Sequence, residues 1–264
     1  MRDTRPISTV VMDEKEKSNL LDDIKAFLNP QTRQWYSTKG LSYKRGYLLY
    51  GPPGTGKSSL ILAIAGYFGL DIYKLDISRV TESSLGSLFD ELPSKCILLL
   101  EDIDAVDMAR TRHAVKENQA DTNKEKKVSL SALLNALDGV ASQEGRILIM
   151  TTNQPEKLDP ALTRPGRVDK AIELGLATKS VASQLFSVIY EPSDCETIAK
   201  EEAVDGTVLE TLAADFANEM PEGEFSPGQI MSFLEERRHS PRRAMRDLQP
   251  WITRIRDGKT KCGG

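Results

Sequence analysis

Residues 51–58 of this chain read GPPGTGKS, and this octapeptide does more than any other stretch to decide the fold. It matches the pattern G-x-x-x-x-G-K-[ST], in which glycines let backbone N–H groups turn inward around phosphates. A short apolar run at residues 47–50 precedes the loop, and a mostly apolar stretch at residues 58–68 follows it. A strand, a phosphate-binding loop and a helix are therefore expected in this order, with the positive end of the helix facing the phosphates.

Two side chains of the loop have distinct expected roles. Lys57 is expected to reach the outer phosphates, and the hydroxyl of Ser58 is expected to bind Mg²⁺. A glycine-rich turn in front of a core helix is the alternative interpretation. The predicted nucleotide-binding residues are Gly51, Pro52, Pro53, Gly54, Thr55, Gly56, Lys57, Ser58 and Ser59.

Two further apolar runs end in polar side chains. Residues 97–104 read ILLLEDID, so a buried strand should end at Glu101 and Asp102. Ligands bind outside the carboxyl ends of strands in open α/β sheets. One carboxylate is therefore expected in the Mg²⁺ shell, and the other is expected to orient and activate an attacking water. Residues 147–153 read ILIMTTN, and the amide of Asn153 is expected to hold that water or the γ-phosphate.

Strands and helices are expected to alternate along the first two-thirds of the chain. This order predicts parallel strands with right-handed crossovers and helices on both faces of the sheet. The fold class is therefore α/β, with a parallel five-stranded sheet sandwiched by helices. The expected strands are residues 47–50, 71–75, 96–100, 147–151 and 171–174.

Beyond residue 178 only helical patterns remain, which predicts a small all-helical second domain. Val208, Leu212 and Phe216 are expected to share one apolar helical face. Residues 226–229 read SPGQ, a capping box with proline at the first helical position. The expected boundaries are 1–177 for the core, including an N-terminal strand and helix at 7–30, and 178–264 for the helical domain.

Composition limits the function classes. Of 264 residues, 39% are hydrophobic and 28% are charged, which is typical of a soluble globular protein. The 35 basic and 39 acidic side chains leave a net charge of −4, which disfavours a general nucleic-acid binder. Three widely spaced cysteines predict no disulfide framework. No apolar stretch approaches the roughly 20 residues of a membrane span, and no signal peptide is expected.

Four motifs together resemble the ordered landmarks of the AAA ATPases: residues 51–58, residues 98–105 (LLLEDIDA), residues 150–153 (MTTN) and residues 158–169 (LDPALTRPGRVD). The chain resembles one subfamily more closely, on residues 45–50 (RGYLLY), the Glu-Asp order at 101–102 and residues 130–142 (LSALLNALDGVAS). This subfamily is the mitochondrial inner-membrane chaperone-translocases, which insert the Rieske iron–sulfur subunit during assembly of respiratory complex III. The similarity extends over residues 5–256.

The resemblance implies a role for each matching residue, with ATP and Mg²⁺ as the cofactors. Glu101 takes the position of the carboxylate associated with Mg²⁺, and Asp102 takes that of the catalytic carboxylate. This order is the reverse of the wider superfamily, so which of the two is the general base stays open. Asn153 matches the sensor 1 position. Arg164 and Arg167 match the arginine fingers that reach the nucleotide of a neighbouring subunit.

The resemblance also implies partners and a location. The chain is expected to form a homo-oligomeric ring with arginine fingers acting in trans, which are worth about 10³–10⁵ in rate. The expected protein substrate is the folded Rieske iron–sulfur subunit. A membrane segment preceding Met1 is expected to anchor the protein at the mitochondrial inner membrane, with this domain on the matrix side. Residues 76–86 lack the aromatic side chain of threading pores, which favours moving a folded substrate through a wide ring.

Three alternatives remain at this point. One is an AAA paralogue with the same ATPase engine and another substrate. Another is a nucleic-acid remodelling AAA ATPase of the clamp-loader or helicase-loader type, which the net charge and the lack of an aromatic–basic stretch disfavour. The third is a nucleotide-binding scaffold without turnover.

Overall fold

The computed structural model divides into two compact units by its contacts. The first comprises Met1–Pro53 and Lys57–Leu174, and the second comprises Gly54–Gly56 and Gly175–Gly264. The structure describes residues 5–76, 80–104, 133, 135, 137, 144–191 and 205–262.

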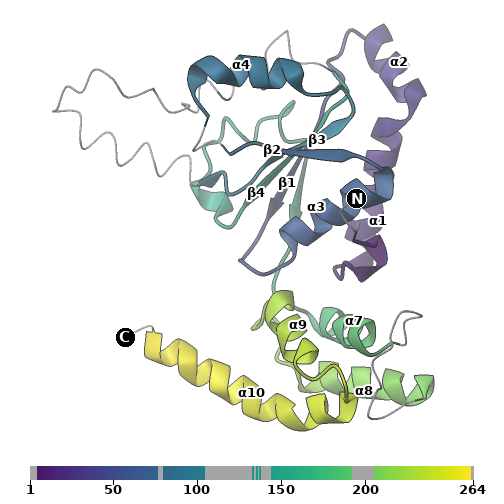
Figure 1. The fold of residues 1–264 in the computed structure, drawn as a ribbon, viewed down its shortest axis with the longest axis vertical. Helices are drawn as coiled ribbons and strands as arrows, with labels where there is room; N and C mark the ends of the chain where they lie inside the picture. The colour runs from purple at the N-terminus through teal and green to yellow at the C-terminus, as the bar shows by residue number, and fades with distance from the viewer. Residues whose placement is uncertain are drawn as a thin grey trace, which may run out of the picture. The chain divides into compact units, whose positions relative to one another are not determined.

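The first unit is built on a five-stranded sheet in the order β2-β3-β4-β1-β5, and every neighbouring pair is parallel (Figure 1). This confirms the predicted parallel five-stranded sheet. Tyr50 pairs with Thr152, and Leu100 pairs with Met150, so the three central strands end at the same edge. The strands are β1 (Arg45–Tyr50), β2 (Asp71–Lys74), β3 (Cys96–Leu100), β4 (Ile147–Thr152) and β5 (Lys170–Glu173).

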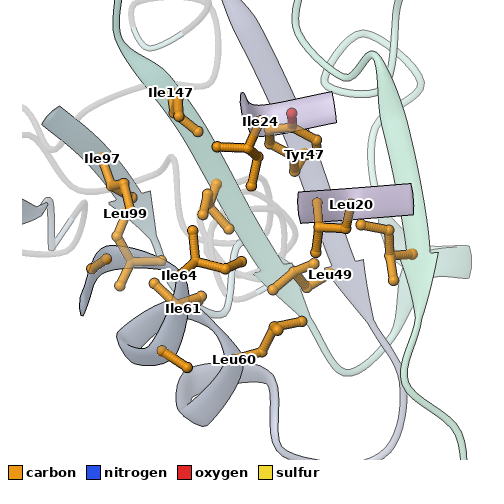
Figure 2. Packing of buried hydrophobic residues seen from close by; sticks show 14 of the residues in the cluster. Leu20, Ile24, Tyr47, Leu49, Leu60, Ile61, Ile64, Ile97, Leu99 and Ile147 are labelled. Atoms are coloured by element: carbon orange, nitrogen blue, oxygen red, sulfur yellow. The ribbon is translucent and has the colours of Figure 1, made fainter. Parts of the chain in front are cut away.

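The three central strands are buried on both faces, and alternate side chains of each strand pack on opposite sides of the sheet. Tyr47 and Leu49 of β1 pack into one hydrophobic cluster with α1 (Glu14–Leu28) and α3 (Lys57–Phe68), which Figure 2 shows from close by. Leu48 packs into a second cluster on the other face. Buried side chains of this size contribute roughly 1.5–3 kcal/mol each, so the sheet is held from both sides.

The second cluster includes helix α4 (Glu82–Glu91), which contributes Leu85 and Phe89. Leu133 and Leu137, both helical, also belong to it. Asn135 is also helical, and the remaining residues of the 130–142 motif lie outside the described residues.

The prediction of an N-terminal strand is wrong. Ile7–Thr9 instead forms a short 3-10 helix, η1. The N–H and the hydroxyl of Thr9 both donate to the carbonyl of Pro6, at 3.0 and 2.8 Å. These local hydrogen bonds close a turn and compete with strand pairing, as threonine hydroxyls often do.

A second short helix, α2 (Pro30–Thr38), was not predicted. Its start has a clear local cause: the Asn29 side chain accepts from the N–H of Gln31 at 2.9 Å, with Pro30 at the first position. A further 3-10 turn, η2 (Pro155–Lys157), follows β4.

The second unit contains only helices in its described part beyond residue 174, as predicted for the C-terminal region. Ser226 and Gln229 form the predicted capping box, with the Ser226 N–H donating to Gln229 Oε1 at 2.9 Å. Aromatic rings fill the centre, and Phe216 stacks on Phe233 with centroids 6.2 Å apart. The helices are α7 (Lys179–Tyr190), α8 (Gly206–Glu219), α9 (Pro227–Glu235) and α10 (Pro241–Cys262).

Val208, on the predicted apolar face of α8, is 39% exposed. The helix buries Leu209, Ala213 and Phe216 instead. These three positions follow the i, i+4, i+7 spacing, so they form one stripe that leaves Val208 on its flank. Among the described residues, no helix combines the length and apolarity that a membrane crossing needs.

Candidate nucleotide-binding site

The predicted polar residues gather at the carboxyl edge of the sheet because the strands are parallel and nearly in register. The phosphate-binding loop leaves β1 after Tyr50, and Glu101 directly follows β3. Asn153 directly follows β4, which lies between these two strands. The strand order therefore brings together motifs that are 40 to 100 residues apart in the chain.

The loop itself depends on glycine. Gly51, Gly54 and Gly56 have φ angles of 137°, 79° and 97°, in the region that residues with a Cβ rarely adopt. At Gly51 a Cβ would also lie 2.1 Å from the carbonyl oxygen of Leu174, so even alanine does not fit there. A backbone of this kind turns successive N–H groups toward one side and can form a concave anion-binding site.

Lys57 opens helix α3 and is only 8% exposed. Its ammonium donates to the carbonyls of Gly51 and Pro52, at 2.7 and 2.9 Å. Burial lowers the pKa of Lys57, and the nearby carboxylates of Asp102 and Asp104 oppose this shift. The ammonium thus lies against the loop that is predicted to hold phosphates.

Ser58 and Glu101 meet although they are 43 positions apart. The Ser58 hydroxyl donates to Glu101 Oε1 at 3.2 Å, and the other carboxylate oxygen, Oε2, forms an ion pair with Lys74. Sequence reasoning missed Lys74, because a lysine at the end of a short strand belongs to no motif. Mg²⁺ prefers oxygen ligands, and in nucleotide sites it binds one or two protein side chains together with the phosphates. A hydroxyl beside a carboxylate supplies such ligands. The residues present therefore fit Mg²⁺.

Asp102 and Asn153 form a second pair, with Asn153 Nδ2 donating to Asp102 Oδ1 at 3.2 Å. Asp102 has a φ of +50°, the one positive value among the described residues other than glycine. Aspartate tolerates this conformation better than most residues. The Asp102 N–H donates to Thr151 Oγ1 at 3.1 Å, so β4 holds the backbone of Asp102 and the residue after β4 holds its carboxylate.

Two supporting residues could not be predicted individually. Thr152 is fully buried, and its hydroxyl donates to Asp104 Oδ1 at 2.8 Å and accepts from the N–H of Gln154 at 3.0 Å. Arg5 donates through Nη1 to Ser59 Oγ at 3.1 Å, which brings a guanidinium to the first turn of α3. Polar residues after an apolar strand hint at Thr152, but nothing in the sequence points to Arg5.

Arg164 and Arg167 do not join these residues. The carbonyl of Arg167 lies against Gly46, at the opposite end of β1 from the loop. Gly51 follows Gly46 by five positions along the strand, which corresponds to roughly 16 Å. Arg164 is exposed, and the Arg167 guanidinium donates to the carbonyl of Ala161. Within one chain, the two arginines are therefore far from the phosphate-binding loop.

The fold and the grouped residues define a class of protein, and a comparison with protein families agrees. Residues 47–176 match the family described as ATPase family associated with various cellular activities (AAA). The chain belongs to this family: it is an AAA ATPase, with the predicted parallel sheet and helical C-terminal region.

Within the family, the chain is closely related to the mitochondrial chaperone BCS1 proteins. It is 43% identical over 251 residues to the probable mitochondrial chaperone BCS1-A of Dictyostelium discoideum, covering 94% of this chain and 55% of the relative. It is 40% identical over 202 residues to the human mitochondrial chaperone BCS1, covering 75% and 47%. It is also 39% identical over 242 residues to AAA-ATPase At2g18193 of Arabidopsis thaliana, covering 87% and 47%. The chain thus spans about half the length of these relatives.

Proposed function

We propose that this protein hydrolyses ATP with Mg²⁺ at the carboxyl edge of its sheet and uses the resulting conformational change to translocate and assemble a protein substrate. The observation that carries the ATPase part is the contact between Ser58 of the phosphate-binding loop and Glu101 at the end of β3. This contact places the two expected Mg²⁺ ligands side by side. An AAA ATPase domain implies ATP hydrolysis, and the chain carries such a domain.

In this proposal the loop binds the triphosphate through backbone N–H groups, and Lys57 moves from the loop carbonyls to the outer phosphates. Ser58 and Glu101 hold Mg²⁺, which neutralises charge on the phosphate oxygens. Ser59, next in α3, contacts the nucleotide close to the Arg5 guanidinium. The remaining nucleotide-binding residues are Gly51, Pro52, Pro53, Gly54, Thr55 and Gly56.

The two carboxylates take different roles because they have different neighbours. Glu101 contacts Ser58, which supports a place in the Mg²⁺ shell. Asp102 contacts Asn153, which supports a water held between a carboxylate and an amide. We therefore assign Asp102 as the general base and Asn153 as the residue that positions the water. The contact with Asn153 supports Asp102 for this role, and the contact with Ser58 supports Glu101 as the Mg²⁺ ligand.

Arg164 and Arg167 complete the site in trans. The Arg167 backbone lies beside Gly46, roughly 16 Å of strand away from Gly51, so this arginine is poorly placed to stabilise charge at its own loop. A homo-oligomeric ring, which is typical of the AAA family, would bring the arginines of one subunit to the nucleotide of the next. The domain boundaries in this proposal stay at 1–177 and 178–264.

The proposed substrate is the folded Rieske iron–sulfur subunit, handled at the mitochondrial inner membrane from the matrix side during complex III assembly. The printed names of the BCS1 relatives, mitochondrial chaperones, support a mitochondrial protein substrate. Residues 76–86 contain no aromatic side chain, which supports movement of a folded chain through a wide ring. Residues 77–79 lie outside the described part of the structure.

A second candidate is the same ATPase engine acting on another substrate. The observation in its favour is the Arabidopsis relative, which is 39% identical and is named only as an AAA-ATPase. Purified protein in its ATP-bound state should retain the folded iron–sulfur subunit if the first candidate holds. An electron cryomicroscopy structure with an extended chain gripped in a narrow pore would contradict it.

The ATPase proposal is tested by separating binding from hydrolysis. Lys57→Ala should abolish ATP binding in calorimetry with Mg²⁺, because no other cation of the loop reaches the outer phosphates. The Asp102→Asn and Glu101→Gln variants should still bind ATP but should no longer hydrolyse it. Lys157→Ala, an exposed lysine of η2, is the matched control and should behave as the wild type. If Lys57→Ala binds ATP with wild-type affinity, the proposal that this loop binds the nucleotide is contradicted.

A further inference from the structure

Lys74 lies at the carboxyl end of β2, beside the site but outside every motif of the sequence. It is opposite Leu99 in the β2–β3 ladder, so it reaches the same edge of the sheet as Glu101. Leu99 packs in the cluster that contains α3. Because paired residues of neighbouring strands face the same side, Lys74 lies on the side of the sheet from which Ser58 approaches Glu101.

The carboxylate of Glu101 is shared between two partners. Oε1 accepts from the Ser58 hydroxyl, and Oε2 pairs with the Lys74 ammonium. The Lys74 side chain is 58% exposed, whereas that of Glu101 is 22% exposed. Asp76 and Asp102 add electrostatic attraction for the same ammonium. The Lys74 ammonium thus contacts the expected metal site through Glu101, while much of its side chain is exposed to solvent.

A fixed cation at this point acts on metal and nucleotide in opposite ways. It competes with Mg²⁺ for the Glu101 carboxylate, and it repels the divalent ion. It also offsets the repulsion between Glu101 and the phosphates of a nucleotide that arrives without metal. Both effects make nucleotide binding less dependent on Mg²⁺ than it would be with Glu101 unpaired.

We propose that Lys74 is a positioning residue that sets the Mg²⁺ dependence of nucleotide binding by holding one oxygen of Glu101. The inference rests on the proposed ATPase function and adds to it a residue that tunes the metal affinity of the site. Lys74 contacts Glu101 rather than the reacting atoms, so its effect is on binding and on the metal concentration that binding requires.

The test measures binding of a fluorescent ADP analogue, without turnover, in EDTA and over a series of Mg²⁺ concentrations. Lys74→Met should lower the half-saturating Mg²⁺ concentration roughly threefold to fivefold, a modest factor because the ion pair is partly exposed. It should also weaken binding in EDTA. Lys74→Arg, which keeps the charge, should stay within about twofold of the wild type. Lys157→Met is the matched control and should leave both quantities unchanged.

The possible outcomes distinguish the role of Lys74 from the proposed ATPase function on which it rests. Wild-type protein without any nucleotide binding in Mg²⁺ would remove the proposed function and this inference with it. Normal wild-type binding, with Lys74→Met matching Lys157→Met at every Mg²⁺ concentration, would overturn the role of Lys74 alone. Lys74→Arg behaving as Lys74→Met would also overturn it, because the charge would then not be responsible. Equal thermal midpoints for the three variants would show that all of them are folded.

Discussion

The two edges of the same sheet are built differently. At the amino edge, Asp23 of α1 is tied to three side chains: it accepts two hydrogen bonds from Arg45 (2.9 and 2.6 Å), accepts one from Tyr47 (2.6 Å) and pairs with Lys170 (3.0 Å). At the carboxyl edge, Lys57 donates to two carbonyls of its own loop. The amino edge joins separate elements through a charge network, and the carboxyl edge carries contacts that nucleotide and metal can replace.

The amino edge of the sheet therefore has a structural role and is called the frame below, whereas the carboxyl edge carries the expected binding site. At the amino edge, Asp23 links α1 to β1 and β5, so losing it removes the charged contacts between the helix and the two strands. At the carboxyl edge, the Ser58–Glu101 and Lys74–Glu101 contacts join the residues expected to bind Mg²⁺. Arg167 belongs to the frame, because its backbone packs on Gly46.

The largest effect is expected from removing Arg164 and Arg167, which tests whether these arginines act on the nucleotide of a neighbouring subunit. Replacing both Arg164 and Arg167 by alanine should lower ATP hydrolysis about 10³–10⁵-fold, or roughly 4–7 kcal/mol, and leave ATP binding intact. Mixing this variant with Lys57→Ala should restore part of the activity, since one supplies the loop and the other supplies the arginines. An ATPase assay on the mixture decides the matter. No recovery in mixed rings would show that the arginines do not act in trans.

The next effect probes the close packing of the amino edge. A Cβ on Gly46 would lie 1.7 Å from the carbonyl oxygen of Arg167, so Gly46→Ala must displace backbone and should cost about 3 kcal/mol. Thermal unfolding should show a midpoint lower by roughly 6–12 °C. Gly86→Ala in α4 is the control, because nothing lies within 4 Å of its Cβ position and alanine favours a helix. If both variants unfold at the same temperature, the contact at Gly46 is not what the structure shows.

The smallest effect concerns the charge network. Burial alone would raise the pKa of Asp23, but hydrogen bonds from Arg45, Tyr47 and Lys170 lower it from 3.8 to about 2. A lowered folded-state pKa stabilises the protein above pH 3.8, and this contribution of about 2 kcal/mol disappears as the pH falls through 2.

Asp23→Asn should therefore lose about 2 kcal/mol at pH 7 and show a flatter decline of stability between pH 5 and 2. Asp22→Asn, an exposed neighbour on the same helix, should change little. Denaturant unfolding at several pH values measures both. An unchanged pH profile in Asp23→Asn would mean that the network does not hold the amino edge.

Part of the fold and the site could be read from local sequence. The expected strand at 96–100 matches β3 residue for residue, and the capping box at Ser226 starts α9 as predicted. These features depend on side chains only a few positions apart, where apolar runs and caps act directly. The N-terminal strand failed for the same reason, since the local turn at Pro6 and Thr9 outcompeted an apolar pattern.

From the residues alone it follows that a phosphate-binding loop joins a strand to a helix, and that acidic residues end another buried strand. The contacts between these motifs depend on the fold: Glu101 meets Ser58, Lys74 of the edge strand pairs with Glu101, and Arg167 lies at the far end of β1. These contacts join residues from 27 to more than 100 positions apart. They follow from the order of the strands, because neighbours in a sheet are chosen by burial of whole faces rather than by closeness along the chain.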